Sequence, residues 1–159
     1  MTFVLCLLAA CSVAAASGGN GHATFEGTCT FSGVLTQEPP VTNLPQPGRA
    51  TARAVGTCSG SPARYFARAH GDISCGGGTA TGRGFIRIGR RKLRFLFSEV
   101  RGPGVAAVRL EGARGGSAAG EARVSEEEDP VQIAQQCSGP GLRSVRIDID
   151  IATTPSLSG

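Results

Sequence analysis

Apolar and polar residues alternate with a period of two through most of this 159-residue chain, and this alternation constrains its fold more than any other feature. The clearest example is the segment 145–154, VRIDIDIATT. A period of two places successive side chains on opposite faces of a β-strand, so that one face is apolar and the other polar. The same alternation predicts further strands at about residues 25–35, 49–59, 63–75, 79–88, 92–97, 106–111 and 118–124.

Most connections between these strands are short and rich in Gly, which predicts antiparallel hairpins. The exception is the segment 36–48, TQEPPVTNLPQPG, whose prolines we expect to form a loop because proline cannot continue a hydrogen-bonded ladder. About eight strands at this spacing predict an all-β fold, an antiparallel sandwich or barrel. Inward-facing Ala and Gly on the second, fourth and seventh strands either let layers approach closely or leave room for a small cavity.

The period changes in the segment 125–141, SEEEDPVQIAQQCSGPG, which predicts one short helix before the last strand. Asp129 is a suitable N-cap and Pro130 a suitable first helical residue, because a proline there loses no hydrogen bond. The preceding glutamates favour the positive end of the helix, and Gly139 is a suitable C-terminal stop. Cys137, near that end, can attach the helix to the sheet.

The N-terminal residues 2–16, TFVLCLLAACSVAAA, carry no charge and are too few to span a membrane comfortably. They resemble a secretory signal peptide, with an A-x-A cleavage site at residues 14–16. Residues 8–11 also match a lipobox, in which Cys11 would carry a lipid anchor. We favour soluble secretion, with a membrane-anchored lipoprotein as the alternative. Residues 1–21 are therefore expected to form a signal and linker, and residues 22–159 a single all-β domain.

Four cysteines remain after this segment, and an even number in an exported chain predicts two disulfides. They are Cys29, Cys58, Cys75 and Cys137. Their separations lack the close pairs of zinc sites, so neither a metal nor a cofactor is expected. Cys58 and Cys75 lie at opposite ends of a predicted hairpin, beyond the reach of a bond. The pairing Cys29–Cys58 with Cys75–Cys137 is therefore favoured, although the sequence does not fix the connectivity.

The segment 85–97, FIRIGRRKLRFLF, holds five basic residues and no acid in a chain of net charge +4. By alternation its aliphatic residues belong to the core, while Arg83, Phe85, Arg87 and Arg94 share the outer face. These four are the candidate residues for binding an extracellular or cell-wall polyanion or a carbohydrate. A solvated hairpin face is the favoured interpretation, and no dedicated nucleic-acid motif is present. The partners are otherwise unknown.

The sequence gives little support for catalysis. His70 and Asp72 share the outer face of one strand, but a hydrolase also needs a nucleophile and an oxyanion site, and no G-x-S-x-G motif is present. Asp148 and Asp150 could bind Ca²⁺ or hydrolyse a glycoside, but cross-strand ion pairing is the simpler explanation. His22 lies in the expected linker. A small secreted hydrolase is therefore the less favoured alternative.

Several phrases, among them GTCTFSGVL, SCGGGTATGRG, LEGARGGSAAGEA and VRIDIDIAT, recur in a type of small secreted protein. On these residues the segment 25–154 resembles an uncharacterised group of disulfide-bonded β proteins from high-GC Gram-positive bacteria. The resemblance implies an extracellular β domain and carries over no catalytic residue. The sequence thus predicts a secreted or cell-surface domain without catalytic activity, with a structural or ligand-binding role. A lined interior cavity would favour ligand binding.

Overall fold

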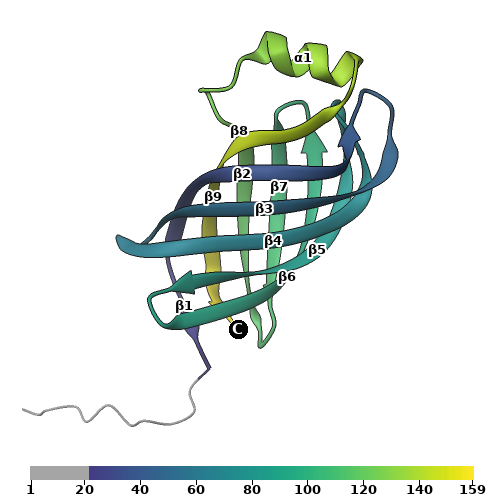
Figure 1. Ribbon diagram of the computed structural model, residues 1–159. Coiled ribbons are helices and arrows are strands. Elements are labelled where there is room, and N and C mark those ends of the chain that lie inside the picture. Colours follow the sequence, from purple (N-terminus) through teal and green to yellow (C-terminus); the bar gives the residue numbers. More distant parts are fainter. Residues whose placement is uncertain (1–21) are drawn as a thin grey trace, which may run out of the picture.

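The computed structural model describes residues 22–159, and in it eight antiparallel strands close into a barrel (Figure 1). The strands are β2 (Thr28–Val41), β3 (Gln46–Cys58), β4 (Ser61–Ser74), β5 (Gly77–Ile88), β6 (Arg91–Gly102), β7 (Val105–Gly112), β8 (Gly116–Val124) and β9 (Leu142–Ser158). A two-residue strand, β1 (Thr24–Phe25), pairs with the end of β9. The predicted all-β fold is confirmed, and of the two predicted architectures, sandwich or barrel, the structure is the barrel.

The last strand closes the barrel. β9 pairs along one edge with β2, as in Phe31 with Ile149, and along the other edge with β8, as in Ala122 with the same Ile149. Each remaining strand pairs with its neighbour in sequence. Closure leaves no open sheet edge in the barrel, which removes the usual site of strand-to-strand aggregation.

The expected loop at residues 36–48 is wrong in its extent. β2 continues to Val41 and β3 begins at Gln46, so the connection is short. Pro39 and Pro40 are tolerated because they lie beyond the last residue pair that joins β2 to β3, which is Glu38 with Arg49, and within the irregular stretch between Thr36 and Val41 on the β9 side. A missing N–H at such a position costs no ladder bond between these two strands.

The predicted helix is confirmed as α1 (Pro130–Ser138), which lies across one end of the barrel (Figure 1). The Asp129 side chain accepts a hydrogen bond from the backbone N–H of Val131 at 2.9 Å, and Gly139 is the C-cap residue. At the other end of α1, the backbone N–H of Asn43 donates to the carbonyl of Cys137 at 3.1 Å. In residues 22–159 no helix has the length and apolar character needed to cross a membrane.

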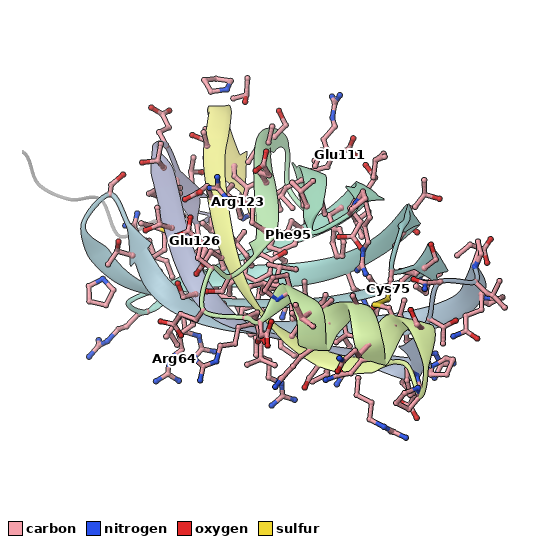
Figure 2. All side chains as sticks on the ribbon, turned by 90° about the horizontal axis from the view of Figure 1, so that it is seen from above. Arg64, Cys75, Phe95, Glu111, Arg123 and Glu126 are labelled. Carbon is pink, nitrogen blue, oxygen red and sulfur yellow. A yellow bond between two sulfur atoms is a disulfide. The ribbon has the colours of Figure 1, made fainter. Side chains whose placement is uncertain are left out.

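Two disulfides hold the barrel, with the pairing that the sequence favoured. Cys29 and Cys58 are directly opposite each other on β2 and β3, at the barrel end remote from α1. Cys75, just after β4, is bonded to Cys137 near the end of α1. Figure 2, seen from above, shows Cys75 beside α1. The second disulfide therefore ties the helix to the rim of the barrel.

The barrel end remote from α1 is filled by large side chains. Phe31, Tyr65 and Phe95 pack in a row, with ring centroids 5.6 and 5.7 Å apart. Residues with almost no exposed surface complete this core: Ile86, Leu93, Leu110 and Leu157.

The signal, linker and lipid-anchor predictions for residues 1–21, Cys11 included, lie outside the described residues.

Candidate functional site

The barrel interior beneath α1 contains a cavity of about 520 Å³. It exists because the strands around it present small side chains to the interior. Six of the alanines that line it come from four strands: Ala50, Ala52, Ala67, Ala69, Ala106 and Ala122. The sequence left open whether the inward Ala and Gly residues let the layers approach closely or leave a small cavity. In this part of the barrel they leave a cavity.

Larger apolar groups form the rest of the cavity wall. Val145, Ile147 and Ile149 of β9 line one side. Tyr65 lies at the bottom, because it also stacks on Phe95 of the filled core. Ile133, Ala134 and Cys137 of α1, together with Cys75, form the roof. The cavity therefore lies between a packed aromatic floor and a helix fixed by a disulfide.

Among the polar residues that line the cavity, Gln37, Glu99 and Arg101 contact one another, and we call these three the polar cluster. Gln37 and Glu99 are each 9% exposed, and the Arg101 side chain is 11% exposed. Arg101 Nε and Nη2 lie 2.8 and 2.5 Å from Glu99 Oε1, and Nη1 donates to Gln37 Oε1 at 3.3 Å. A buried charge is tolerated when it is paired and hydrogen-bonded, as here.

The polar cluster crosses the barrel. Gln37 is on β2, while Glu99 and Arg101 are on β6. In the closed order of eight strands, β2 and β6 are four steps apart in either direction, so they are opposite walls. The hydrogen bond between Arg101 and Gln37 therefore spans the cavity instead of following one wall.

Tyr65 adds a hydroxyl group to the cavity. Burial raises the pKa of Tyr65 well above its usual range, and the nearby negative charge of Glu99 raises it further. The hydroxyl therefore keeps its proton at any physiological pH and can donate a hydrogen bond.

His70 and Asp72, which were considered as a catalytic pair and not favoured, lie away from the cavity. Both are exposed on the outer face of β4, where they border a shallow depression with Glu38 and Arg49. The hydrogen bonds of the described residues include none between these two side chains. His22 contacts Arg114. Within residues 22–159, no three His, Cys, Asp or Glu side chains are grouped so that they could hold a metal ion.

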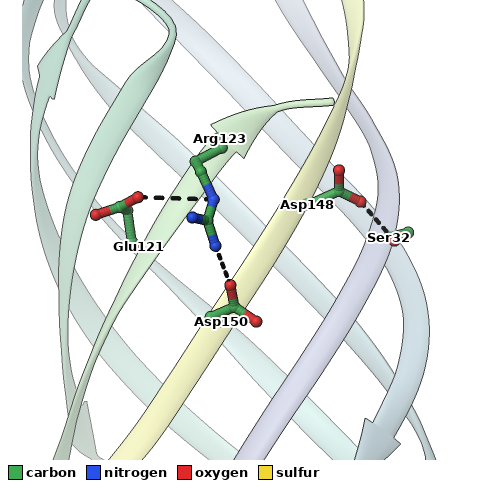
Figure 3. A network of polar contacts seen from close by, with 5 residues as sticks. All are labelled: Ser32, Glu121, Arg123, Asp148 and Asp150. Carbon is green, nitrogen blue, oxygen red and sulfur yellow. Dashed lines mark hydrogen bonds and ion pairs between the residues drawn. The ribbon is translucent and has the colours of Figure 1, made fainter. Parts of the chain in front are cut away.

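The two aspartates of β9 belong to a surface network (Figure 3). Asp150 forms an ion pair with Arg123 of β8, which also lies 3.7 Å from Glu121. Asp148 instead accepts a hydrogen bond from the Ser32 hydroxyl at 2.5 Å. The predicted cross-strand ion pair is thus present for Asp150, whereas Asp148 has a hydroxyl partner.

In the structure, Arg83, Phe85, Arg87 and Arg94 lie together on the outside of the barrel. Strand pairing places further basic residues beside them, which the sequence did not predict to be neighbours. We define the basic face as these cations of β3 to β6: Arg53, Arg64, Arg68, Arg83, Arg87, Lys92 and Arg94. Figure 2 shows Arg64 on the outside of the barrel. None of the ion pairs among the described residues involves a cation of this face.

Two stacked rings lie at the centre of the basic face. Phe66 and Phe85 are paired across β4 and β5, with centroids 5.4 Å apart. Arg53 and Arg68 lie over the Phe66 ring, and Lys92 lies 4.2 Å from the Phe85 centroid. These cation–π contacts hold the long side chains in place over the sheet.

The polar cluster was not predicted from the sequence, because the predicted strand ended at Phe97 and Gln37 lay in the expected loop. The available signal was the alternation itself, because the inward series Leu93, Phe95 and Phe97 continues to Glu99 and Arg101. Charged residues at inward positions are uncommon, and they mark either a paired buried group or a binding site.

No protein-family model matches the chain, and neither a curated protein nor a solved structure shows significant similarity to it. The geometry of the barrel is therefore the basis for assigning a function.

Proposed function

We propose that this protein binds one small, mostly apolar molecule inside its barrel. The observation that carries the proposal is the cavity of about 520 Å³, lined by alanines and aliphatic side chains. Pockets for small molecules typically have volumes of roughly 300–1,000 Å³ and are mainly apolar, with a few polar groups that orient the ligand. An eight-stranded barrel is also about the size that can hold one small ligand.

The proposed role is binding without catalysis, outside the cell. The two disulfides fit an oxidising compartment, and the sequence resemblance to small secreted proteins supports the same location. The polar groups in the cavity favour binding over catalysis. They are an ion pair, an amide and a protonated phenol, all of which can form hydrogen bonds with a ligand. Soluble secretion remains our preferred prediction over a lipid anchor.

The proposal can be tested with the neutral fluorophore N-phenyl-1-naphthylamine. We expect its fluorescence to rise on titration with the protein and to saturate at one probe per chain. Ala52→Phe places a ring in the cavity and should weaken binding at least about tenfold, which corresponds to about 1.4 kcal/mol. Val55→Phe, on the outer face of the same strand, is the matched control and should bind like the wild type. Absence of saturable binding, or equal weakening by both variants, would contradict the proposal.

A second candidate function rests on the basic face. Its seven cations lie on four adjacent strands and form no ion pair with a carboxylate of residues 22–159, which makes this face a favourable surface for a polyanion. Phe66 and Phe85 are half-buried and each already has a cation over its ring, so charge recognition is better supported than stacking of sugars or bases. We therefore propose an anionic extracellular or cell-wall polysaccharide as the second partner of this protein.

Retention on immobilised heparin tests this second function. Arg64→Gln/Arg87→Gln removes two charges from the basic face and should weaken binding about tenfold at low salt, with a shallower dependence on salt. Arg114→Gln/Arg143→Gln removes the same charge from other strands and turns, and should have a much smaller effect. Equal losses in the two double variants would mean that only net charge matters, and the basic face would then not be a site.

A further inference from the structure

We infer that the ligand of the cavity is an uncharged amphiphile, whose single polar group binds at the polar cluster of Gln37, Glu99 and Arg101. This inference rests on the proposed binding function and adds the chemical class of the ligand. It predicts a preference for an alcohol or amide over a fatty acid or an organic cation of the same length. Three features of the cavity support it: its charge balance, its remaining hydrogen-bonding atoms and its apolar lining.

The charge balance disfavours an ionic ligand on energetic grounds. Arg101 and Glu99 neutralise each other through two contacts to one carboxylate oxygen. The remaining charged residue that borders the cavity, Arg123, is ion-paired with Asp150 on the outer surface (Figure 3). A ligand carboxylate or ammonium would therefore lose its hydration without gaining an unpaired counterion, and this costs free energy.

The polar cluster nevertheless has hydrogen-bonding capacity left. The bonds recorded among the described residues use Glu99 Oε1 and Gln37 Oε1, which leaves Glu99 Oε2 as an acceptor and the Gln37 amide nitrogen as a donor. Every fully buried side-chain polar atom of the described residues has a hydrogen-bond partner. Because these two atoms have no such partner, they are not fully buried and must border open space. A hydroxyl or amide can both donate to the first and accept from the second.

The rest of the cavity suits a hydrocarbon body. Ala52 and Ala67 on one side and Ile147 and Ile149 on another present only carbon to the interior. Each methylene group buried there contributes about 0.8 kcal/mol. Apolar surface therefore supplies affinity, and the polar cluster fixes which end of the ligand lies beside it.

The test is displacement of bound N-phenyl-1-naphthylamine by four compounds with the same ten-carbon chain. These are 1-decanol, decanoate, decyltrimethylammonium and decane, each used below its solubility limit and, for the two ions, below the micellar concentration, at pH ~7, where decanoate is ionised. We expect 1-decanol to displace the probe at concentrations at least about tenfold lower than either ion, and below those of decane. If decanoate or decyltrimethylammonium displaced the probe at the same concentration as 1-decanol, the inference would be overturned, but the binding function would remain supported. Failure of the probe to bind would instead contradict the binding function itself.

Variants of the polar cluster give a second, independent readout. Glu99→Gln leaves the Arg101 charge without its counterion, so we expect decanoate to gain at least about tenfold relative to 1-decanol. Glu99→Leu/Arg101→Met removes both charges together and avoids an unpaired buried ion. In that variant the advantage of 1-decanol over decane should fall. An unchanged order of ligands in both variants would show that the polar cluster does not select the ligand.

Discussion

At the scale of single residues, side-chain volume determines which part of the barrel is filled and which is empty. Tyr65 marks the boundary, with Phe31 and Phe95 packed on one side of it and the alanine-lined cavity on the other. In the filled half, glycine makes room for the rings. A Cβ atom at Gly84 would lie 2.7 Å from the Phe95 ring and 2.3 Å from the carbonyl oxygen of Phe66.

Gly84→Ala is therefore expected to destabilise the fold. Neither the ring nor the backbone oxygen can move aside without disturbing the core, and overpacking of this kind costs about 1–3 kcal/mol. Urea unfolding should show this loss in the free energy of unfolding. Gly48→Ala is the matched control, because Gly48 also lies in a strand and a Cβ atom there would meet its nearest neighbour, the carbonyl oxygen of Glu38, only at 3.7 Å. No loss of stability in Gly84→Ala would contradict the packing described for this half of the barrel.

Tyr65 is the single tyrosine of the chain, which makes its ionisation directly measurable. Its pKa is raised by burial and by Glu99, while the unfolded chain ionises near the ordinary value of 10.0. Above about pH 10 the unfolded state therefore binds fewer protons than the folded state, and stability falls as pH rises. We expect this decline to approach about 1.4 kcal/mol per pH unit and to be absent in Tyr65→Phe. Tyrosinate absorbance appearing in the folded protein near pH ~10 would contradict it.

At the scale of elements, α1 and the Cys75–Cys137 disulfide act as a fixed roof over the cavity. Much of this was predictable from local chemistry, because Asp129, Pro130 and Gly139 are the residues that begin and end a helix. The extent of β2 was not predictable in this way. Whether a proline breaks a ladder depends on whether a neighbouring strand lies opposite its missing N–H, and that is a property of strand pairing.

Removing the roof disulfide should release ligand faster. Cys75→Ser/Cys137→Ser opens a link across 62 residues and is expected to lower the free energy of unfolding by about 3–4 kcal/mol. Because α1 is then held only by weaker contacts, the dissociation rate of bound N-phenyl-1-naphthylamine should rise. Cys29→Ser/Cys58→Ser is the matched control, since it costs comparable stability at the far end of the barrel. Equal dissociation rates in the two variants, measured by stopped flow, would show that the roof does not retain the ligand.

At the scale of the whole molecule, strand pairing joins residues that sequence alternation could only sort into inward and outward. Alternation placed Arg64 and Arg87 outward correctly, but their alignment across β4 and β5 follows from the register of the barrel. Alternation also identified the inward alanines, but it did not predict whether the opposite walls of the barrel would pack together or leave a cavity between them. The cavity, the polar cluster that spans it and the extended basic face are all consequences of closing eight strands into a ring.

The most direct test of the central claim is a titration of N-phenyl-1-naphthylamine followed by methyl NMR of the wild-type protein. The account predicts saturable shifts, complete at one equivalent, for the inward methyl groups of Val145, Ile147 and Ile149. The exposed methyl groups of Val55 and Val100 should not shift. Shifts confined to these exposed methyl groups, or no saturable shift at all, would contradict a ligand site inside the barrel.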